Sequence, residues 1–116
     1  MSWPLRRIEW KTPLSELKPG DWCTRPAEDI KGEGTLSNEF LASGRTEVVF
    51  IRLPGKCGAW SPDYQFHGTG GTGWTLTLTE DGSPFTATPS VNVEGCYHGW
   101  LQNGALTDDC EGRAFG

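Results

Sequence analysis

The apolar residues of this chain follow the two-residue period of β-strands more closely than a helical period. In TEVVFIRLPG, apolar and β-branched side chains run almost unbroken over residues 48–53 and stop at a Pro-Gly pair, which predicts a strand buried on both faces. In GWTLTLTEDG, Trp74, Leu76 and Leu78 alternate with threonines. That alternation predicts a strand with one buried face.

The C-terminal third predicts two further features of a sheet. Pro89 lies inside SPFTATPSVNV and cannot donate to a ladder, which predicts an edge strand or a bulge there. YHGWLQNGALTDD predicts a hairpin with arms at residues 97–101 and 105–108, joined by a type I′ turn at Asn-Gly. The polar stretch 25–38 is expected to be a surface loop, and residues 57–73 a long irregular connection.

Composition favours the same fold class. The chain has 116 residues, with 16 Gly and 8 Pro that favour turns and short elements. Six Trp, five Phe and two Tyr supply core area in a chain that is only 35% hydrophobic. We therefore expect one mostly β domain spanning residues 1–116, built on a twisted antiparallel sheet with long Gly/Pro-rich loops. Residues 1–37 are expected to form an N-terminal extension with a short strand and a polar loop.

Charge is distributed unevenly along the chain. The net charge is −5, and Arg113 is the only Lys or Arg after residue 56, against seven acids. An acidic half without a basic stripe argues against direct nucleic-acid binding and suits a protein partner with a basic surface. MSWPLRRIEW shows no signal peptide, and no apolar run is long enough to cross a membrane. These features predict a cytoplasmic protein with reduced cysteines.

The stretch GCYHGWLQNGALTDDC raises the question of a metal site. Cys96 and His98 form a close pair, and the hairpin brings Cys110 to the same end. A tetrahedral zinc site needs a fourth ligand, for which Cys57 or His67 from the long loop, or Cys23, are the candidates. The alternative is that the cysteines are buried and that His98 donates to a backbone carbonyl. A Rieske cluster is excluded because its second Cys-x-x-His is missing.

Catalysis without a metal has little support in the sequence. Ser90 in TPSV is expected to be a turn or bulge residue, because no motif places a base beside it. GTGGTG lacks the Lys-Ser/Thr ending of a phosphate loop and precedes a strand.

Candidate partner-binding residues are mostly aromatic. Trp60, Tyr64 and Phe66 gather in the Gly-rich loop, where they either cap a core poor in aliphatic residues or form an exposed patch. Trp100 on the hairpin falls on the face opposite Tyr97. The predicted partner-binding surface also includes Trp100, Asp108 and Asp109.

Three blocks together resemble a family of small bacterial and bacteriophage proteins whose function is not established. They are FLASGRTEVVFIRLPG, GWTLTLTEDGSPFTATPSV and CYHGWLQNGALTDDC, and the resemblance covers residues 38–116. It implies zinc binding through an upstream Cys-Pro-x-Cys knuckle and a downstream Cys/His group, which Cys96, His98 and Cys110 match. The knuckle cysteines are absent here, where Leu-Ala-Ser-Gly stands instead.

The resemblance and the composition together lead to a functional expectation. We expect a small non-enzymatic accessory protein of phage type that binds a host protein in the host cytoplasm, with modulation of host defence or metabolism as the expected role. A structural zinc ion is the only cofactor expected. The alternative is a metal-dependent hydrolase associated with ubiquitin-like modification, because some members of the family lie in gene clusters with such components.

Overall fold

Two β-sheets form the framework of the protein in the computed structural model, which describes residues 2–9, 11–13, 16–30, 35–56, 58–65 and 73–113. Sheet A has the strand order β1-β9-β8-β7-β6. Its strands are β1 (Trp3–Pro4), β6 (Thr75–Leu78), β7 (Pro84–Val93), β8 (Tyr97–Gln102) and β9 (Ala105–Leu106). Sheet B has the order β2-β3-β4-β5, with β2 (Arg6–Arg7), β3 (Asp21–Pro26), β4 (Glu47–Arg52) and β5 (Ala59–Trp60).

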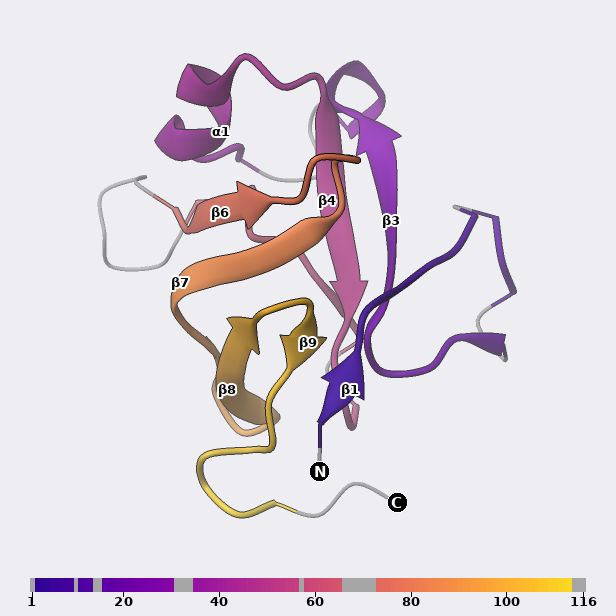
Figure 1. Cartoon of the computed structure of the whole chain (residues 1–116), viewed down its shortest axis with the longest axis vertical. Helices are drawn as coiled ribbons and strands as arrows, with labels where there is room; N and C mark the ends of the chain where they lie inside the picture. The colour runs from indigo at the N-terminus through magenta and orange to yellow at the C-terminus, as the bar shows by residue number, and fades with distance from the viewer. Residues whose placement is uncertain are drawn as a thin grey trace.

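The mostly β prediction is confirmed, and sheet A is antiparallel throughout. Sheet B is mixed, because β2 runs parallel to β3 while β3, β4 and β5 pair antiparallel. The N-terminal segment joins both sheets, with β1 beside β9 and β2 beside β3. Figure 1 shows this indigo segment leaving β1 and running out beside β3 before the chain enters that strand.

The main core lies between the two sheets. Sheet B contributes Trp22, Val49 and Ile51, and sheet A contributes Tyr97 and Leu101, each with at most 3% of its surface exposed. Inward residues alternate with outward ones along the strands, so both sheets turn one apolar face to this core. The predicted alternation in residues 74–79 is confirmed, because the three threonines there are exposed.

A second, smaller cluster covers part of the opposite face of sheet B. Val48 packs there with Ile30 and Phe40, so β4 is buried on both faces as its unbroken apolar run predicts. Ile30 ends a 3₁₀-helix, η2 (Ala27–Ile30), and Phe40 lies in the helix α1 (Asn38–Ser43).

The surface-loop prediction for residues 25–38 is therefore wrong in part. Strand β3 extends to Pro26 and η2 follows it directly. The Ser37 side chain caps α1 by accepting from the Phe40 N–H at 3.1 Å, and Gly44 ends the helix with φ 77°. Six residues with one buried side chain are too short to show a helical period.

The predicted hairpin and bulge are both present. Asn103 and Gly104 have φ of 51° and 81°, as a type I′ turn requires, between β8 and β9. Pairing of β7 with β8 shifts between Ala87 and Val91, on either side of Pro89. Because β7 lies between β6 and β8, the proline marks a bulge and not an edge. No helix among the described residues is long and apolar enough to cross a membrane.

Candidate functional site

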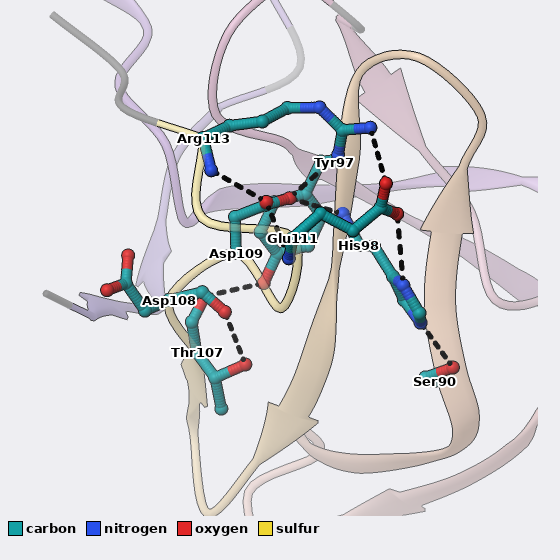
Figure 2. Close-up of polar contacts among 8 residues, drawn as sticks. All are labelled: Ser90, Tyr97, His98, Thr107, Asp108, Asp109, Glu111 and Arg113. Atoms are coloured by element: carbon teal, nitrogen blue, oxygen red, sulfur yellow. Dashed lines mark hydrogen bonds and ion pairs between the residues drawn. The ribbon is translucent and has the colours of Figure 1, made fainter.

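The segment after β9 is fixed to β8 by one carboxylate, that of Asp109. Its oxygens accept hydrogen bonds from the backbone N–H groups of His98 at 2.8 Å, Glu111 at 2.9 Å and Arg113 at 3.0 Å. The Arg113 guanidinium adds a fourth bond at 2.9 Å. Figure 2 shows these contacts converging on the Asp109 carboxylate. The turn thereby brings Glu111 beside His98, across the strand end.

Asp109 is buried, with 7% of its surface exposed. Burial alone would raise its pKa, but hydrogen bonds from the backbone of Arg113 and His98, the Arg113 side chain and the backbone of Glu111 outweigh it. Together they lower the pKa of Asp109 to about 2. The carboxylate is therefore ionised throughout the neutral range, as a buried acceptor of four bonds requires.

The imidazole of His98 lies between a carboxylate and a hydroxyl. Its Nδ1 is 3.2 Å from Glu111 Oε2, and its Nε2 is 3.3 Å from Ser90 Oγ. The other oxygen of Glu111 accepts from Arg113 Nη2 at 3.1 Å. Figure 2 shows the ring lying between Glu111 and Ser90. The side chains of His98 and Glu111 are 30% and 50% exposed, so this cluster lies on an open face.

Strand register explains why Ser90 meets His98. Asn92 pairs directly with His98 across β7 and β8, and Ser90 lies two residues earlier on the same face. Side chains at such diagonal positions come within reach of each other. The backbone of Ser90 is fixed in addition by Trp74, whose Nε1 donates to its carbonyl at 3.3 Å. The expectation that Ser90 is a bulge residue is confirmed, because it falls in the shifted interval of β7.

On the inner face of β8, Tyr97 anchors the same turn. Its hydroxyl donates to the Thr107 carbonyl at 2.6 Å. Burial raises the pKa of Tyr97 to about 12, and the side chain of Thr107 acts in the opposite direction. Gly99 makes room for the ring, since a Cβ there would come 2.1 Å from the Tyr97 hydroxyl.

The predicted metal ligands are only partly brought together. The Cys110 N–H donates to the His98 carbonyl at 2.5 Å, so the backbones of these two residues lie side by side across the hairpin. Cys96 is half-buried, Cys110 is exposed, and Cys23 is buried in sheet B. In the part of the chain that the structure describes, no three His, Cys, Asp or Glu side chains are grouped to hold a metal. Both nitrogens of His98 face other side chains, and Cys57 and His67 lie outside the described residues, so a complete zinc site stays a prediction.

The predicted partner-binding residues are divided between core and surface. Trp60 is 8% exposed and its ring meets Trp74 in the main core, while Tyr64 packs edge-on against Phe50 at 5.8 Å. These two aromatics cap the cores. Trp100 is half-buried on the outer face of sheet A, Asp108 is exposed and Asp109 is buried. Phe66 lies outside the described residues.

Sequence reasoning missed a groove on the outer face of sheet B. Its volume is about 880 Å³, and the N-terminal segment between β2 and β3 forms one wall. Phe50 and Ala59 from β4 and β5 form the apolar floor with the half-buried or exposed Ile8, Pro13 and Leu17. The sequence indicated this groove only through the outward-facing apolar residues of β4 and β5, Phe50 and Ala59.

Positive charge is concentrated in this groove. Lys11, Arg25 and Arg52 line it, and the Arg25 guanidinium lies 5.9 Å from the centre of the Phe50 ring. The one lining acid, Asp21, is neutralised by Arg6 through bonds of 3.0 and 2.8 Å. Cys23 also lines the groove, and burial raises the pKa of its thiol, with Arg25 acting in the opposite direction. The thiol is therefore neutral at pH 7.

Comparison of the chain with known protein families, with curated proteins and with solved structures gives no match.

Proposed function

We propose that the protein acts by binding, and that its groove on sheet B takes a small organic anion with an apolar body. The observation that supports this most directly is the lining of the groove, in which an apolar floor is combined with Lys11, Arg25 and Arg52. A volume of about 880 Å³ falls within the ~300–1,000 Å³ range of small-molecule sites. Apolar contact would supply affinity, and the cations would select the sign of the ligand charge.

Arg52 is the lining cation best suited to fix an anion. It projects from β4, a strand whose inner face is rigidly packed, and none of the described residues provides it with a carboxylate partner. A guanidinium presents paired donors that match a carboxylate or phosphate. A second pocket of about 620 Å³ lies beside α1. Glu28 and Glu47 are in its lining, so this pocket does not share the preference of the groove for an anion.

Binding can be tested with anilinonaphthalene sulfonate, an aromatic anion that fluoresces in apolar sites. Octanoate is expected to displace it, whereas octyltrimethylammonium, with the same chain and opposite charge, is not. Arg52→Gln should weaken octanoate binding about tenfold, the value of one charge-assisted contact. Octanoate should also slow alkylation of Cys23, measured by mass spectrometry at that residue.

Lys56→Gln is the matched control, because Lys56 is exposed and outside the groove lining but its loss changes the net charge equally. It should leave the affinity unchanged. Equal displacement by the two octyl compounds, or equal weakening by both variants, would show that the groove does not select anions.

A second candidate function is favoured by the distribution of charge between the sheets. Every Lys and Arg except Arg113 precedes β6 in the chain, and Arg113 is already paired with Asp109 and Glu111. Sheet A therefore presents exposed acids, including Glu94 and Asp108, to a protein partner with a basic surface. Carbodiimide cross-linking in cells joins carboxylates to lysines. Cross-links from these two acids to one host protein would support this function, and their absence would contradict it.

A further inference from the structure

Ser90, His98 and Glu111 are ordered as a nucleophile, a base and a group that orients the base. With Glu111 Oε2 at 3.2 Å accepting the proton of Nδ1, the other ring nitrogen of His98 is left with a free lone pair. That lone pair faces the Ser90 hydroxyl at 3.3 Å. A hydroxyl beside an imidazole that is itself oriented by a carboxylate is the arrangement by which serine is activated.

The scaffold around the three side chains is fixed. Ser90 and His98 lie on adjacent paired strands of sheet A. Glu111 is carried by the turn that the buried Asp109 ties to the His98 backbone at 2.8 Å. Arg113 holds the second oxygen of Glu111 at 3.1 Å. The order of the groups thus depends on backbone pairing and on a buried carboxylate, which hold their relative positions better than mobile side chains alone.

We propose that Ser90 is a nucleophile activated by His98, and that the protein has an esterase activity toward neutral, activated esters. Ser90 Oγ attacks the ester carbonyl carbon while its proton passes to His98 Nε2. The bond from this carbon to the leaving oxygen breaks, His98 returns the proton to that oxygen, and the acyl group remains on Ser90. Water then gives a proton to Nε2 and attacks the acyl carbon. The bond from this carbon to Ser90 Oγ breaks, the proton on Nε2 returns to Oγ, and the acid is released.

The surroundings define the substrate class. The carboxylates of Glu111 and Asp109 disfavour a substrate with a negatively charged acyl group. The His98 side chain is 30% exposed, so solvent reaches the site and the developing oxyanion gains little from a dry environment. Turnover therefore requires a good leaving group, as in an aryl ester.

Two measurements test the activity. A fluorophosphonate probe should label Ser90 in preference to the more exposed Ser2, as mapped by mass spectrometry. Hydrolysis of p-nitrophenyl acetate should show a burst, lost in Ser90→Ala. His98→Ala should slow acylation about 100-fold, the usual contribution of a general base. Lys56→Gln, at an exposed residue outside both the groove and this cluster, should change neither result.

A histidine can itself attack p-nitrophenyl acetate, so Ser90→Ala decides between the two nucleophiles. Turnover that survives in Ser90→Ala, or a probe that labels Ser2 equally, overturns the proposal. Ser90→Cys provides a second variant, whose new thiol should be alkylated more slowly when His98→Ala is added; an unchanged rate also overturns it. Glu111 acts as a positioning residue. Histidine ¹⁵N shifts should report a proton on Nδ1 in the native protein and mixed tautomers in Glu111→Gln.

Discussion

The indole rings of Trp60 and Trp74 meet edge to face, with centroids 5.0 Å apart and planes at 89°. Trp60 ends β5 in sheet B, and Trp74 directly precedes β6 in sheet A, so this contact joins the sheets across the main core. The two N–H groups differ. That of Trp74 donates to the Ser90 carbonyl, whereas that of Trp60 is buried without a hydrogen-bond partner among the described residues.

This difference predicts unequal effects of the same substitution. Trp60→Phe removes an unpaired buried N–H along with some apolar area, whereas Trp74→Phe leaves the Ser90 carbonyl without its donor. We expect Trp74→Phe to lower the free energy of unfolding by about 1 kcal/mol more than Trp60→Phe. Urea denaturation with equal m-values would measure it. A larger loss for Trp60→Phe would mean that its N–H is in fact paired.

Asp63 is a buried charge on which several elements depend. Only 1% of its surface is exposed, and its carboxylate accepts from the Arg45 guanidinium and from the Val49 N–H at 2.9 Å. Asp63→Ala leaves the Val49 N–H unpaired and removes the carboxylate partner of Arg45, so it should lower the free energy of unfolding by ~3–5 kcal/mol. Glu94→Ala, at an exposed acid, should change it by under ~0.5 kcal/mol in the same denaturation experiment. A loss below ~1 kcal/mol for Asp63→Ala would show that water replaces the carboxylate.

The strands could be read from the sequence because each carries its own pattern. The unbroken apolar run of β4 and the Trp-Leu-Leu alternation of β6 reflect the faces that each strand buries. Helix α1 could not be read from the sequence, because its one buried residue, Phe40, gives no helical period. Only the Ser37 cap and Gly44 mark the ends of this helix. The parallel pairing of β2 is likewise set by tertiary contacts, since two exposed arginines carry no strand pattern.

The candidate sites, too, depend largely on tertiary contacts that leave no local pattern in the sequence. The hairpin prediction correctly brings Cys110 next to His98, since both follow from one turn. The contact between Ser90 and His98 depends on the register of β7 against β8, and Glu111 is placed by the Asp109 turn. The groove needs the N-terminal segment to lie over sheet B. Apart from the Asp109 turn itself, these relations join residues that are distant in sequence.

Asp109 should make stability sensitive to acid in a defined window. Its pKa falls from 3.8 to about 2 on folding, so its ionised form stabilises the folded state fully above pH ~4. That contribution is lost as the pH falls from ~4 to ~2. Asp109→Asn lacks it at every pH and cannot replace all four accepted bonds. We expect its melting temperature to lie roughly 5–10 °C below the native value at pH 7.

The difference in melting temperature between the native protein and Asp109→Asn should then shrink as the pH approaches 2. Glu94→Gln serves as the control, because Glu94 is exposed. A difference that stays constant from pH 5 to pH 2 would show that Asp109 has an ordinary pKa in the folded state.

Tyr97 should produce the opposite dependence at alkaline pH. Burial raises the pKa of its phenol from 10.0 to about 12, so between these values the unfolded chain loses a proton that the folded protein keeps. Stability should fall by roughly 1–2 kcal/mol as the pH rises through this window. Tyr97→Phe has no phenol to ionise and should lack this fall, although it also loses the bond to the Thr107 carbonyl. Urea denaturation at pH 9 to 11.5, with phenolate absorbance followed at 295 nm, would measure both effects, and parallel curves for the two proteins would contradict the raised pKa.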